Sequence, residues 1–240
     1  MVVLDPPLDV TFPPLLEAEL VQRRNRFVVL ACWPDGSIVE AHTNNTGTMR
    51  TCSDPGSRIW LSKSDNPSRK LKYSLVLIEA SSGGLVGVDT AMPGKLFVAA
   101  LARRGLAGLE DYRLRRTEVT VAPGSRLDVE LEGPRPAFVE LKNVTLVENG
   151  RLYFPDAVTA RGARHLQELT RLKAAGMADA FAVFVVQRPG GEGLSPADHI
   201  DPHFGAVLRD AVRQGVVPLA YRAAVSCEGA RIVESIPVIL

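Results

Sequence analysis

A change of pattern near Ser81-Ser82-Gly83-Gly84 limits what this chain can fold into. Before it, from Leu15 to Ile78, short apolar runs separated by turn residues predict strands alone. After it, longer runs with helical spacing alternate with strand-like runs. A stretch of small residues and glycines is typical of a boundary between two units. We therefore expect an α+β chain of two domains, residues 1–82 and residues 83–240.

The first unit predicts a small barrel. Its strand-like runs are separated by the turn sequences Pro34-Asp35-Gly36, Asn44-Asn45-Thr46-Gly47 and Asp65-Asn66-Pro67. About five short strands in roughly 70 residues suit a closed β-barrel, and the oligonucleotide-binding (OB) fold is the commonest five-stranded kind. We therefore expect an OB-like five-stranded β-barrel over residues 1–82.

Basic side chains cluster in this unit. Arg23, Arg24 and Arg26 fall close together, and Arg69 and Lys70 belong to a second, mostly basic run. A groove that follows nucleic-acid phosphates would use such side chains, but so would a solvated barrel exterior whose strand edges are protected by charge. Both interpretations stay open. The formal net charge is only +1, so any nucleic-acid surface must be a local patch.

The second unit predicts an α/β domain with a mixed sheet. Its order is helix, three strands, helix, strand, helix, strand. The apolar strand 179–187 suits a sheet that is covered on both faces. The predicted elements are a helix over 93–105, strands over 113–121, 125–131 and 137–144, a helix over 159–175, a strand over 179–187, a helix over 195–215 opened by a Ser195 cap, and strands over 216–224 and 231–240.

Two of these strands carry charged residues at a spacing that suits metal chemistry. Glu140 and Lys142 share one face of their strand because side chains alternate. The Gly- and Pro-rich turn 132–136 would fold this strand back so that Asp128 lies beside Glu140. Glu118, on the preceding strand, is the candidate third carboxylate. Carboxylate oxygens are ligands that Mg²⁺ and Mn²⁺ prefer.

The same spacing has a simpler interpretation. Asp128 or Glu140 would form an ordinary cross-strand salt bridge with Lys142, and the spacing alone leaves both interpretations open.

With a metal present, a site of two carboxylates and a lysine suits phosphodiester hydrolysis. Arg126 and, on the following helix, Arg161 and Arg164 would hold a nucleic-acid backbone beside the metal, or form a solvated surface.

Other classes of protein have less support. Cys32, Cys52 and Cys227 form no CxxC pair, so we predict reduced thiols in a cytoplasmic protein. No apolar run reaches the roughly 18–20 residues of a transmembrane helix, so we expect no membrane partner. His199 and His203, four residues apart on a predicted helix, are a weaker zinc alternative.

Several stretches together resemble the sugar fermentation stimulation protein A (SfsA) family of bacteria and archaea. The longest and most specific stretch is Tyr153–Gly162, which leads to His165-Leu166. The others are Gln22–Phe27, Asn45–Met49, Ser64–Asn66, Ser125–Asp128, Glu140–Leu146, Ser195–Ala197 and Ile200-Asp201.

This resemblance implies an OB-like N-terminal domain and a C-terminal domain similar to PD-(D/E)XK nucleases. It also implies DNA binding and a regulatory role in sugar (maltose) metabolism. On that analogy Asp128 and Glu140 are ligands of Mg²⁺ or Mn²⁺, and Lys142 is the catalytic lysine. The first predicted helix has no acidic residue where many nucleases of this class carry a metal-supporting Glu, so Glu118 is the candidate substitute.

Three functions follow as hypotheses. The first is a DNA-binding protein with mostly backbone contacts and low sequence specificity, since no helix-turn-helix pattern is present. The alternative is a Mg²⁺- or Mn²⁺-dependent DNA nuclease that uses Asp128, Glu140 and Lys142, for which a homodimer would suit cleavage of both strands. The third is a soluble two-domain protein whose basic clusters only solvate it.

Overall fold

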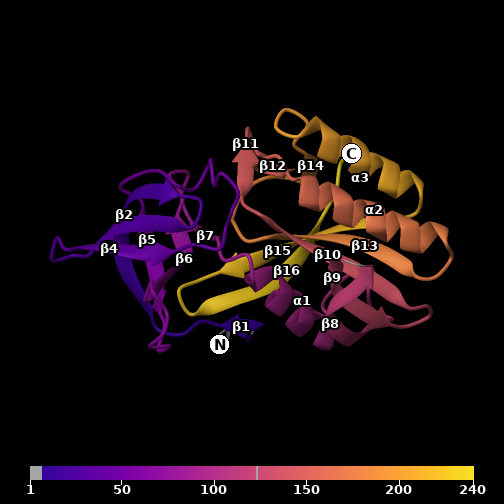
Figure 1. Ribbon diagram of the computed structural model, residues 1–240, viewed down its shortest axis with the longest axis horizontal. Helices are drawn as coiled ribbons and strands as arrows, with labels where there is room; N and C mark the ends of the chain where they lie inside the picture. The colour runs from indigo at the N-terminus through magenta and orange to yellow at the C-terminus, as the bar shows by residue number, and fades with distance from the viewer. Residues whose placement is uncertain (1–6, 123) are drawn as a thin grey trace, which may run out of the picture.

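The computed structural model describes residues 7–122 and 124–240. It contains an N-terminal barrel and a larger α/β domain, which lie side by side (Figure 1). No helix among the described residues is both long enough and apolar enough to cross a membrane.

The N-terminal domain is a closed five-stranded barrel, as predicted. Its strands pair in the order β4-β3-β2-β5-β6, and a further pairing between β4 and β6 closes the sheet. Alternate side chains such as Leu20, Val29 and Ile59 fill the interior, which fits the period of two of a strand. The strands are β2 (Leu15–Asn25), β3 (Val28–Cys32), β4 (Ile38–His42), β5 (Arg58–Lys63) and β6 (Tyr73–Glu79).

The expected boundary at residues 82/83 differs from the structure in two places. The Ser81–Gly84 stretch is a hairpin turn, closed by a hydrogen bond from Ala80 N to Gly84 O at 3.0 Å, and Gly83 and Gly84 both have positive φ. The chain then continues as β7 (Leu85–Gly87), which pairs with β6 of the barrel sheet. At the other end, β1 (Val10–Thr11) pairs with β16 of the second domain. Small residues therefore marked a turn inside the first domain.

The second domain is built on a seven-stranded mixed sheet. Its order is β1-β16-β15-β13-β10-β9-β8. The central pairs β10–β13 and β13–β15 are parallel, whereas β8–β9, β9–β10 and β15–β16 are antiparallel. The strands are β8 (Arg113–Ala122), β9 (Ser125–Glu132), β10 (Ala137–Val144), β13 (Asp179–Val186), β15 (Val217–Val225) and β16 (Gly229–Ile236).

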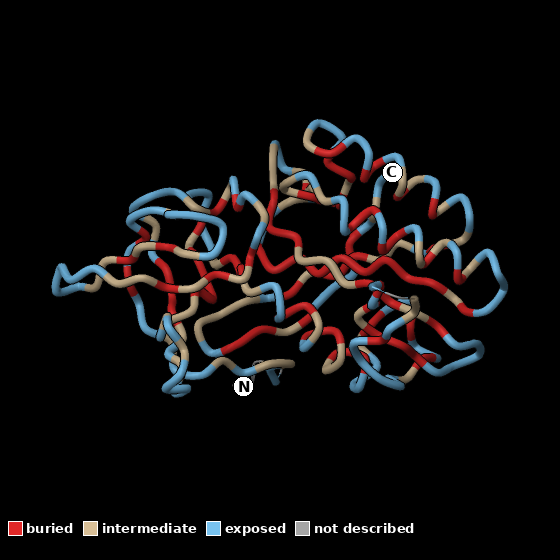
Figure 2. Tube along the Cα trace, in the orientation of Figure 1, coloured by how far each residue is buried: buried red, intermediate tan, exposed pale blue. Residues whose placement is uncertain are grey.

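Helices cover both faces of this sheet. Helix α1 (Met92–Ala102) packs on one face, while α2 (Ala160–Ala174) and α3 (Pro202–Arg213) pack on the other (Figure 1). Strand β13 is consequently buried along nearly all of its length, as its apolar sequence predicts (Figure 2). Thr159 caps α2, because its side chain accepts a hydrogen bond from Gly162 N.

The predicted helix over 195–215 is wrong in its first turns. Ser195 lies in β14 (Leu194–Pro196), which pairs with β12 (Arg151–Phe154), and β11 (Leu146–Glu148) completes this small sheet. Helix α3 begins only at Pro202, where Asp201 is the cap. His199 therefore precedes the helix that holds His203, so the helical spacing that suggested zinc is absent. The strand pairing with β12 has overridden the local Ser-Pro signal.

Candidate metal and nucleic-acid site

Strands β9 and β10 separate at the level of Asp128 and Glu140. Their ladder ends at the pair Val129–Val139. Beyond this pair, the backbone N–H of Leu141, two residues after Val139, donates to Asp128 Oδ2 at 2.6 Å. A side-chain carboxylate has thus replaced a backbone carbonyl as the acceptor. The predicted hairpin does bring the two carboxylates together, but at a point where the two strands diverge.

Glu140 has one oxygen held twice and the other left without a partner. Its Oε1 accepts a hydrogen bond from Lys142 Nζ at 2.5 Å and contacts Nδ1 of His165, which comes from α2. Its Oε2 is buried and has no hydrogen-bond partner among the described residues. The residue is only 3% exposed. An unpaired buried carboxylate oxygen is costly, and a cation or a hydrogen-bond donor beside Oε2 would remove that cost.

The two carboxylates differ in their pKa. Burial, reinforced by the charge of Glu140, raises the pKa of Asp128 to about 6. Burial also acts to raise the pKa of Glu140, but the hydrogen bonds and charges of His165 and Lys142 outweigh it and hold that pKa below its ordinary value. Added positive charge between the two groups would favour ionisation of both.

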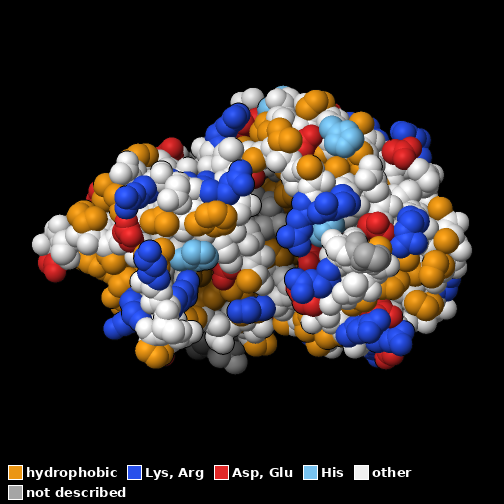
Figure 3. Space-filling model, viewed as in Figure 1, with side chains coloured by type: hydrophobic (Ala, Val, Ile, Leu, Met, Phe, Trp, Pro, Cys, Tyr) orange, Lys and Arg blue, Asp and Glu red, His pale blue; other side chains and the backbone are white. Residues whose placement is uncertain are grey.

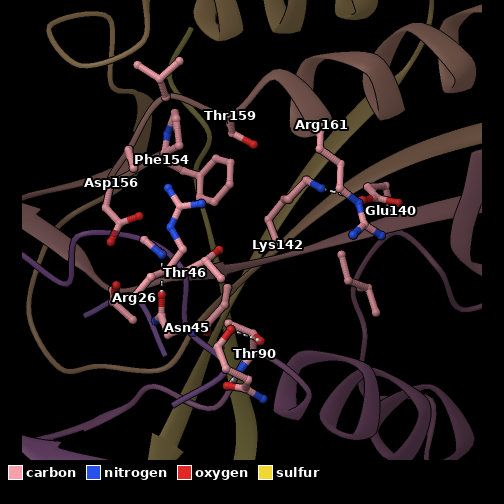
Figure 4. A pocket seen from close by; sticks show the side chains of 18 of the residues that line it. Arg26, Asn45, Thr46, Thr90, Glu140, Lys142, Phe154, Asp156, Thr159 and Arg161 are labelled. Carbon is pink, nitrogen blue, oxygen red and sulfur yellow. Dashed lines mark hydrogen bonds and ion pairs between the residues drawn. The ribbon is translucent and has the colours of Figure 1, made fainter. Parts of the chain in front are cut away.

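These residues line a pocket between the two domains. Its volume is about 480 Å³, and the space-filling view shows the hollow with Lys and Arg side chains on both sides of it (Figure 3). Asp128, Glu140 and Lys142 come from the second domain. Arg26 reaches the pocket from the barrel and Arg161 from α2, so two predicted nucleic-acid contacts lie on different walls (Figure 4).

The barrel wall of the pocket is fixed to the second domain by Asp156. Its Oδ2 accepts the backbone N–H of Met49 at 2.8 Å, and its carbonyl accepts Thr48 Oγ1 at 2.6 Å. Gly47 approaches so closely that an added Cβ would lie 2.1 Å from Asp156 Oδ1, which explains the need for glycine here. The barrel loop 44–49 is therefore a fixed wall of the pocket.

A buried arginine makes a second link between the domains. Arg188 is 1% exposed, and its Nη1 donates to the carbonyl of Thr145 at 2.5 Å and to Oγ1 of Thr51, in the barrel, at 2.9 Å. We call Asp156, Arg188 and their partners the interdomain joint.

The other basic residues predicted in the barrel have different surroundings. The guanidinium of Arg23, on β2, donates to the carbonyls of Asn45 and Gly47, at 2.7 and 2.5 Å, so it holds the pocket loop against the barrel. Arg24 is exposed and pairs with Glu40. The remaining two lie in the segment between β5 and β6, where Arg69 donates to Ser74 Oγ at 2.6 Å and Lys70 is exposed.

The remaining candidates in the second domain lie around the carboxylates. Arg126, Arg161 and Arg164 line a smaller neighbouring pocket. Glu118 lies level with Asp128 on the adjacent strand, but its Oε2 accepts from Arg126 Nε at 2.8 Å. Within residues 7–122 and 124–240, no three His, Cys, Asp or Glu side chains are grouped as a ready metal cage.

Sequence reasoning missed two participants. His165 received no role from its position on the helix after Arg161 and Arg164, yet it is buried against Glu140. Asp156 lies in the distinctive Tyr153–Gly162 stretch, but its partner Met49 is 107 residues away, so no local pattern links them. The local signal for His165 is helical spacing, which places it on the same face of α2 as the apolar residues Leu169 and Leu172.

Comparisons with known proteins cover nearly the whole chain. The family described as "SfsA N-terminal OB domain" matches residues 21–88, and "Sugar fermentation stimulation protein RE domain" matches residues 91–229. A sugar fermentation stimulation protein homolog of Geobacter metallireducens is 47% identical, covering 95% of this chain and 98% of that protein. The homolog of Geobacter sulfurreducens is 44% identical, covering 94% of this chain and 97% of that protein.

A solved structure agrees with the sequence matches. The structure of Pyrococcus furiosus SfsA in complex with Ca²⁺ superposes with a TM-score of 0.88 at 28% identity, covering 98% of this chain and all of that one. Family matches to both domains, relatives above 40% identity and a common fold lead to one conclusion: this chain belongs to the sugar fermentation stimulation protein (SfsA) family.

Proposed function

We propose that this protein binds DNA in the cleft between its two domains, mainly through the phosphate backbone and with low sequence specificity. The observation that carries this proposal is the composition of the interdomain pocket. Arg26 from the barrel and Arg161 from α2 line the same cavity as Asp128, Glu140 and Lys142. Arginine side chains in such a groove neutralise DNA phosphates, and contacts with phosphates carry no sequence information.

The two carboxylates suit a bound divalent cation, Mg²⁺ or Mn²⁺. The donor set fits: Glu140 Oε2 is buried without a partner, and the neighbouring charge of Glu140 helps to raise the pKa of Asp128. Two carboxylates, with phosphate oxygens and waters completing the shell, are typical of Mg²⁺ sites. The Ca²⁺ complex of the Pyrococcus furiosus relative supports this assignment. Glu118 would join only by exchanging Arg126 for the cation.

A second candidate function is hydrolysis of DNA phosphodiesters, as in PD-(D/E)XK nucleases. The position of Lys142 favours it, because Nζ lies 2.5 Å from Glu140 Oε1 and lines the same pocket. A bound cation would supply Lewis-acid charge beside the phosphate. Lys142 would neutralise phosphate charge, and His165 would hold Glu140 in position through its contact with Oε1.

The cellular role that we propose is based on the name of the family. Relatives bear the name sugar fermentation stimulation protein, and we place this chain among regulators of sugar (maltose) metabolism that act through DNA. Its three free cysteines fit a cytoplasmic setting. A homodimer stays a prediction.

Salt dependence of DNA binding tests the first proposal. Fluorescence anisotropy with a labelled duplex should give a steep, linear fall of log K with log salt concentration. Arg26→Ala and Arg161→Ala should each reduce the slope by about 1, because each removes one phosphate contact. Arg171→Ala, on the same helix but outside the pocket, is the matched control and should leave the slope unchanged. Binding that is absent at low salt, or insensitive to both pocket substitutions, would contradict the proposal.

Cleavage assays test the second candidate function, hydrolysis of DNA. Plasmid and linear DNA incubated with Mn²⁺ should be cut by the wild type and left intact by Asp128→Asn. Glu168→Gln, a half-buried carboxylate of α2 that lines neither pocket, is the control and should cut normally. If the wild type binds DNA but cuts none of the forms with Mg²⁺, Mn²⁺ or Ca²⁺, the nuclease function is wrong and the binding function stands.

A further inference from the structure

A second, smaller pocket adjoins the carboxylate site. Its volume is about 380 Å³, and it lies between α2 and the β8–β9 hairpin. Arg126, Arg161 and Arg164 line it with guanidinium groups, and its other polar side chains are Thr120, Ser125 and His165. Figure 3 shows blue side chains gathered around a histidine on the second-domain side of the cleft.

Positive charge in this pocket exceeds negative charge by two. Three guanidinium groups line the pocket, and one of them, Arg126, is neutralised by Glu118, whose carboxylate lies outside the lining. Arg161 donates only to His165 Nε2, at 3.4 Å, and in the described part of the chain Arg164 forms no ion pair within 4.0 Å. A phosphodiester carries one negative charge, whereas a phosphate monoester carries about −1.5 to −2 at pH 7. The charge of this pocket therefore matches a monoester better than a diester.

An unpaired hydroxyl gives independent support. Ser125 is 5% exposed, and its Oγ is buried without a hydrogen-bond partner among the described residues. A buried hydroxyl without a partner is unfavourable, and a phosphate oxygen is an acceptor that would satisfy it. The pocket therefore combines an unmatched donor with the cations that would hold the same anion.

The pocket is connected to the carboxylate site through two residues. Arg161 lines both pockets, and His165, which lines the smaller one, contacts Glu140 through Nδ1. An anion bound between Arg161 and Arg164 would therefore lie next to the place where we position the DNA backbone and the cation.

We propose that this pocket binds the terminal phosphate monoester of a nucleic-acid strand, so that the carboxylate site faces the end of a strand. The assignment rests on the proposed DNA-binding function and specifies which part of the polymer is bound. A protein that binds only the internal backbone would have the same affinity for strands with and without a terminal phosphate. This pocket would be filled only by a strand that carries the terminal phosphate.

Oligonucleotides that differ only at their ends test this assignment. One labelled sequence is prepared with a 5′-phosphate, with a 3′-phosphate, or with hydroxyls at both ends, and anisotropy is measured in EDTA so that no cleavage occurs. One of the phosphorylated forms should bind the wild type about tenfold more tightly than the hydroxyl form, because charge-assisted hydrogen bonds to arginine are strong. Arg164→Ala should abolish this preference, and Ser125→Ala should reduce it. Arg171→Ala, two turns further along α2, should retain it.

The outcomes separate this inference from the function beneath it. Equal affinity for all three oligonucleotides, weakened equally by Arg164→Ala, would overturn the strand-end assignment and leave DNA binding intact. Failure of every oligonucleotide to bind, at low salt and with a normally folded protein, would overturn the proposed function and the assignment with it. A preference that survives Arg164→Ala would place the end phosphate elsewhere and would also overturn it.

Discussion

Asp128 and Asp156 line the same pocket but have opposite roles. The carboxylate of Asp156 contacts the barrel: its Oδ2 accepts a hydrogen bond from the backbone N–H of Met49 at 2.8 Å, close to Gly47. Asp128 accepts one backbone N–H, from Leu141, and faces a second carboxylate. The carboxylate of Asp156 therefore joins the two domains, whereas that of Asp128 is the one we propose as a cation ligand.

The same contrast extends to the regions around them. The interdomain joint places the donors of Arg188 against Thr51 and Thr145, so its charge is used to hold two domains together. The carboxylate site leaves Glu140 Oε2 without a partner. Substitutions in the joint should therefore cost stability, and substitutions in the carboxylate site should cost ligand binding while stability is retained or improved.

The largest effect should come from the joint. Arg188→Ala removes a fully buried side chain, leaves a cavity and deprives the Thr145 carbonyl of its donor. We expect the free energy of unfolding to fall by about 3–5 kcal/mol, measured by urea denaturation. Arg188→Met, which keeps most of the volume, should lose less. If Arg188→Ala stays within about 1 kcal/mol of the wild type, Arg188 does not hold the joint.

Asp128→Asn should raise the free energy of unfolding at pH 8, whereas Arg188→Ala lowers it. The raised pKa of Asp128, about 6, means that folding favours its protonated form. This contribution is fully present below about pH 4 and is lost as pH rises through 6, so the ionised group destabilises the fold at pH 8. Asn cannot ionise, so the variant should be more stable than the wild type at pH 8, by up to about 3 kcal/mol. Thermal unfolding at several pH values should show the difference disappearing below pH 4.

A divalent cation should offset most of that difference in stability. Mn²⁺ at about one hundred times its dissociation constant should stabilise the wild type by about 2.7 kcal/mol at pH 8, because it binds the folded state. The same concentration should not shift the Tm of Asp128→Asn. Equal shifts in both proteins would place the cation at another site.

The smallest effect should come from Asp156→Asn, the matched substitution in the joint. The amide oxygen can still accept from Met49 N, but the hydrogen bond loses its charge. We expect a loss of about 1 kcal/mol, with the Mn²⁺ shift unchanged. A gain in stability at pH 8, as predicted for Asp128→Asn, would remove the distinction between the two aspartates.

Local patterns predicted much of this fold. About five short strand-like runs separated by turn residues predicted the barrel, and the apolar strand 179–187 predicted a sheet covered on both sides. The same reasoning failed where tertiary pairing decides. The Ser81–Gly84 stretch is a hairpin turn, and Ser195 belongs to a strand because β12 lies beside it.

The site shows the same division. The spacing of Asp128, Glu140 and Lys142 on neighbouring strands was readable, because it depends on a short hairpin. Arg23 looked like a surface contact, but its partners Asn45 and Gly47 are more than 20 residues away. Contacts between the two domains have no local signature, so the joint became visible only in three dimensions.

The central claim is that Asp128 and Glu140 form a cation site beside bound DNA. A crystal structure of the protein soaked in Mn²⁺, with an anomalous map at the manganese edge, tests it most directly. We predict one peak between the two carboxylates, in contact with Glu140 Oε2 and with an oxygen of Asp128, at roughly 2.0–2.2 Å for so small a cation. A map without a peak there, at a Mn²⁺ concentration that raises the Tm of the wild type, would contradict the claim.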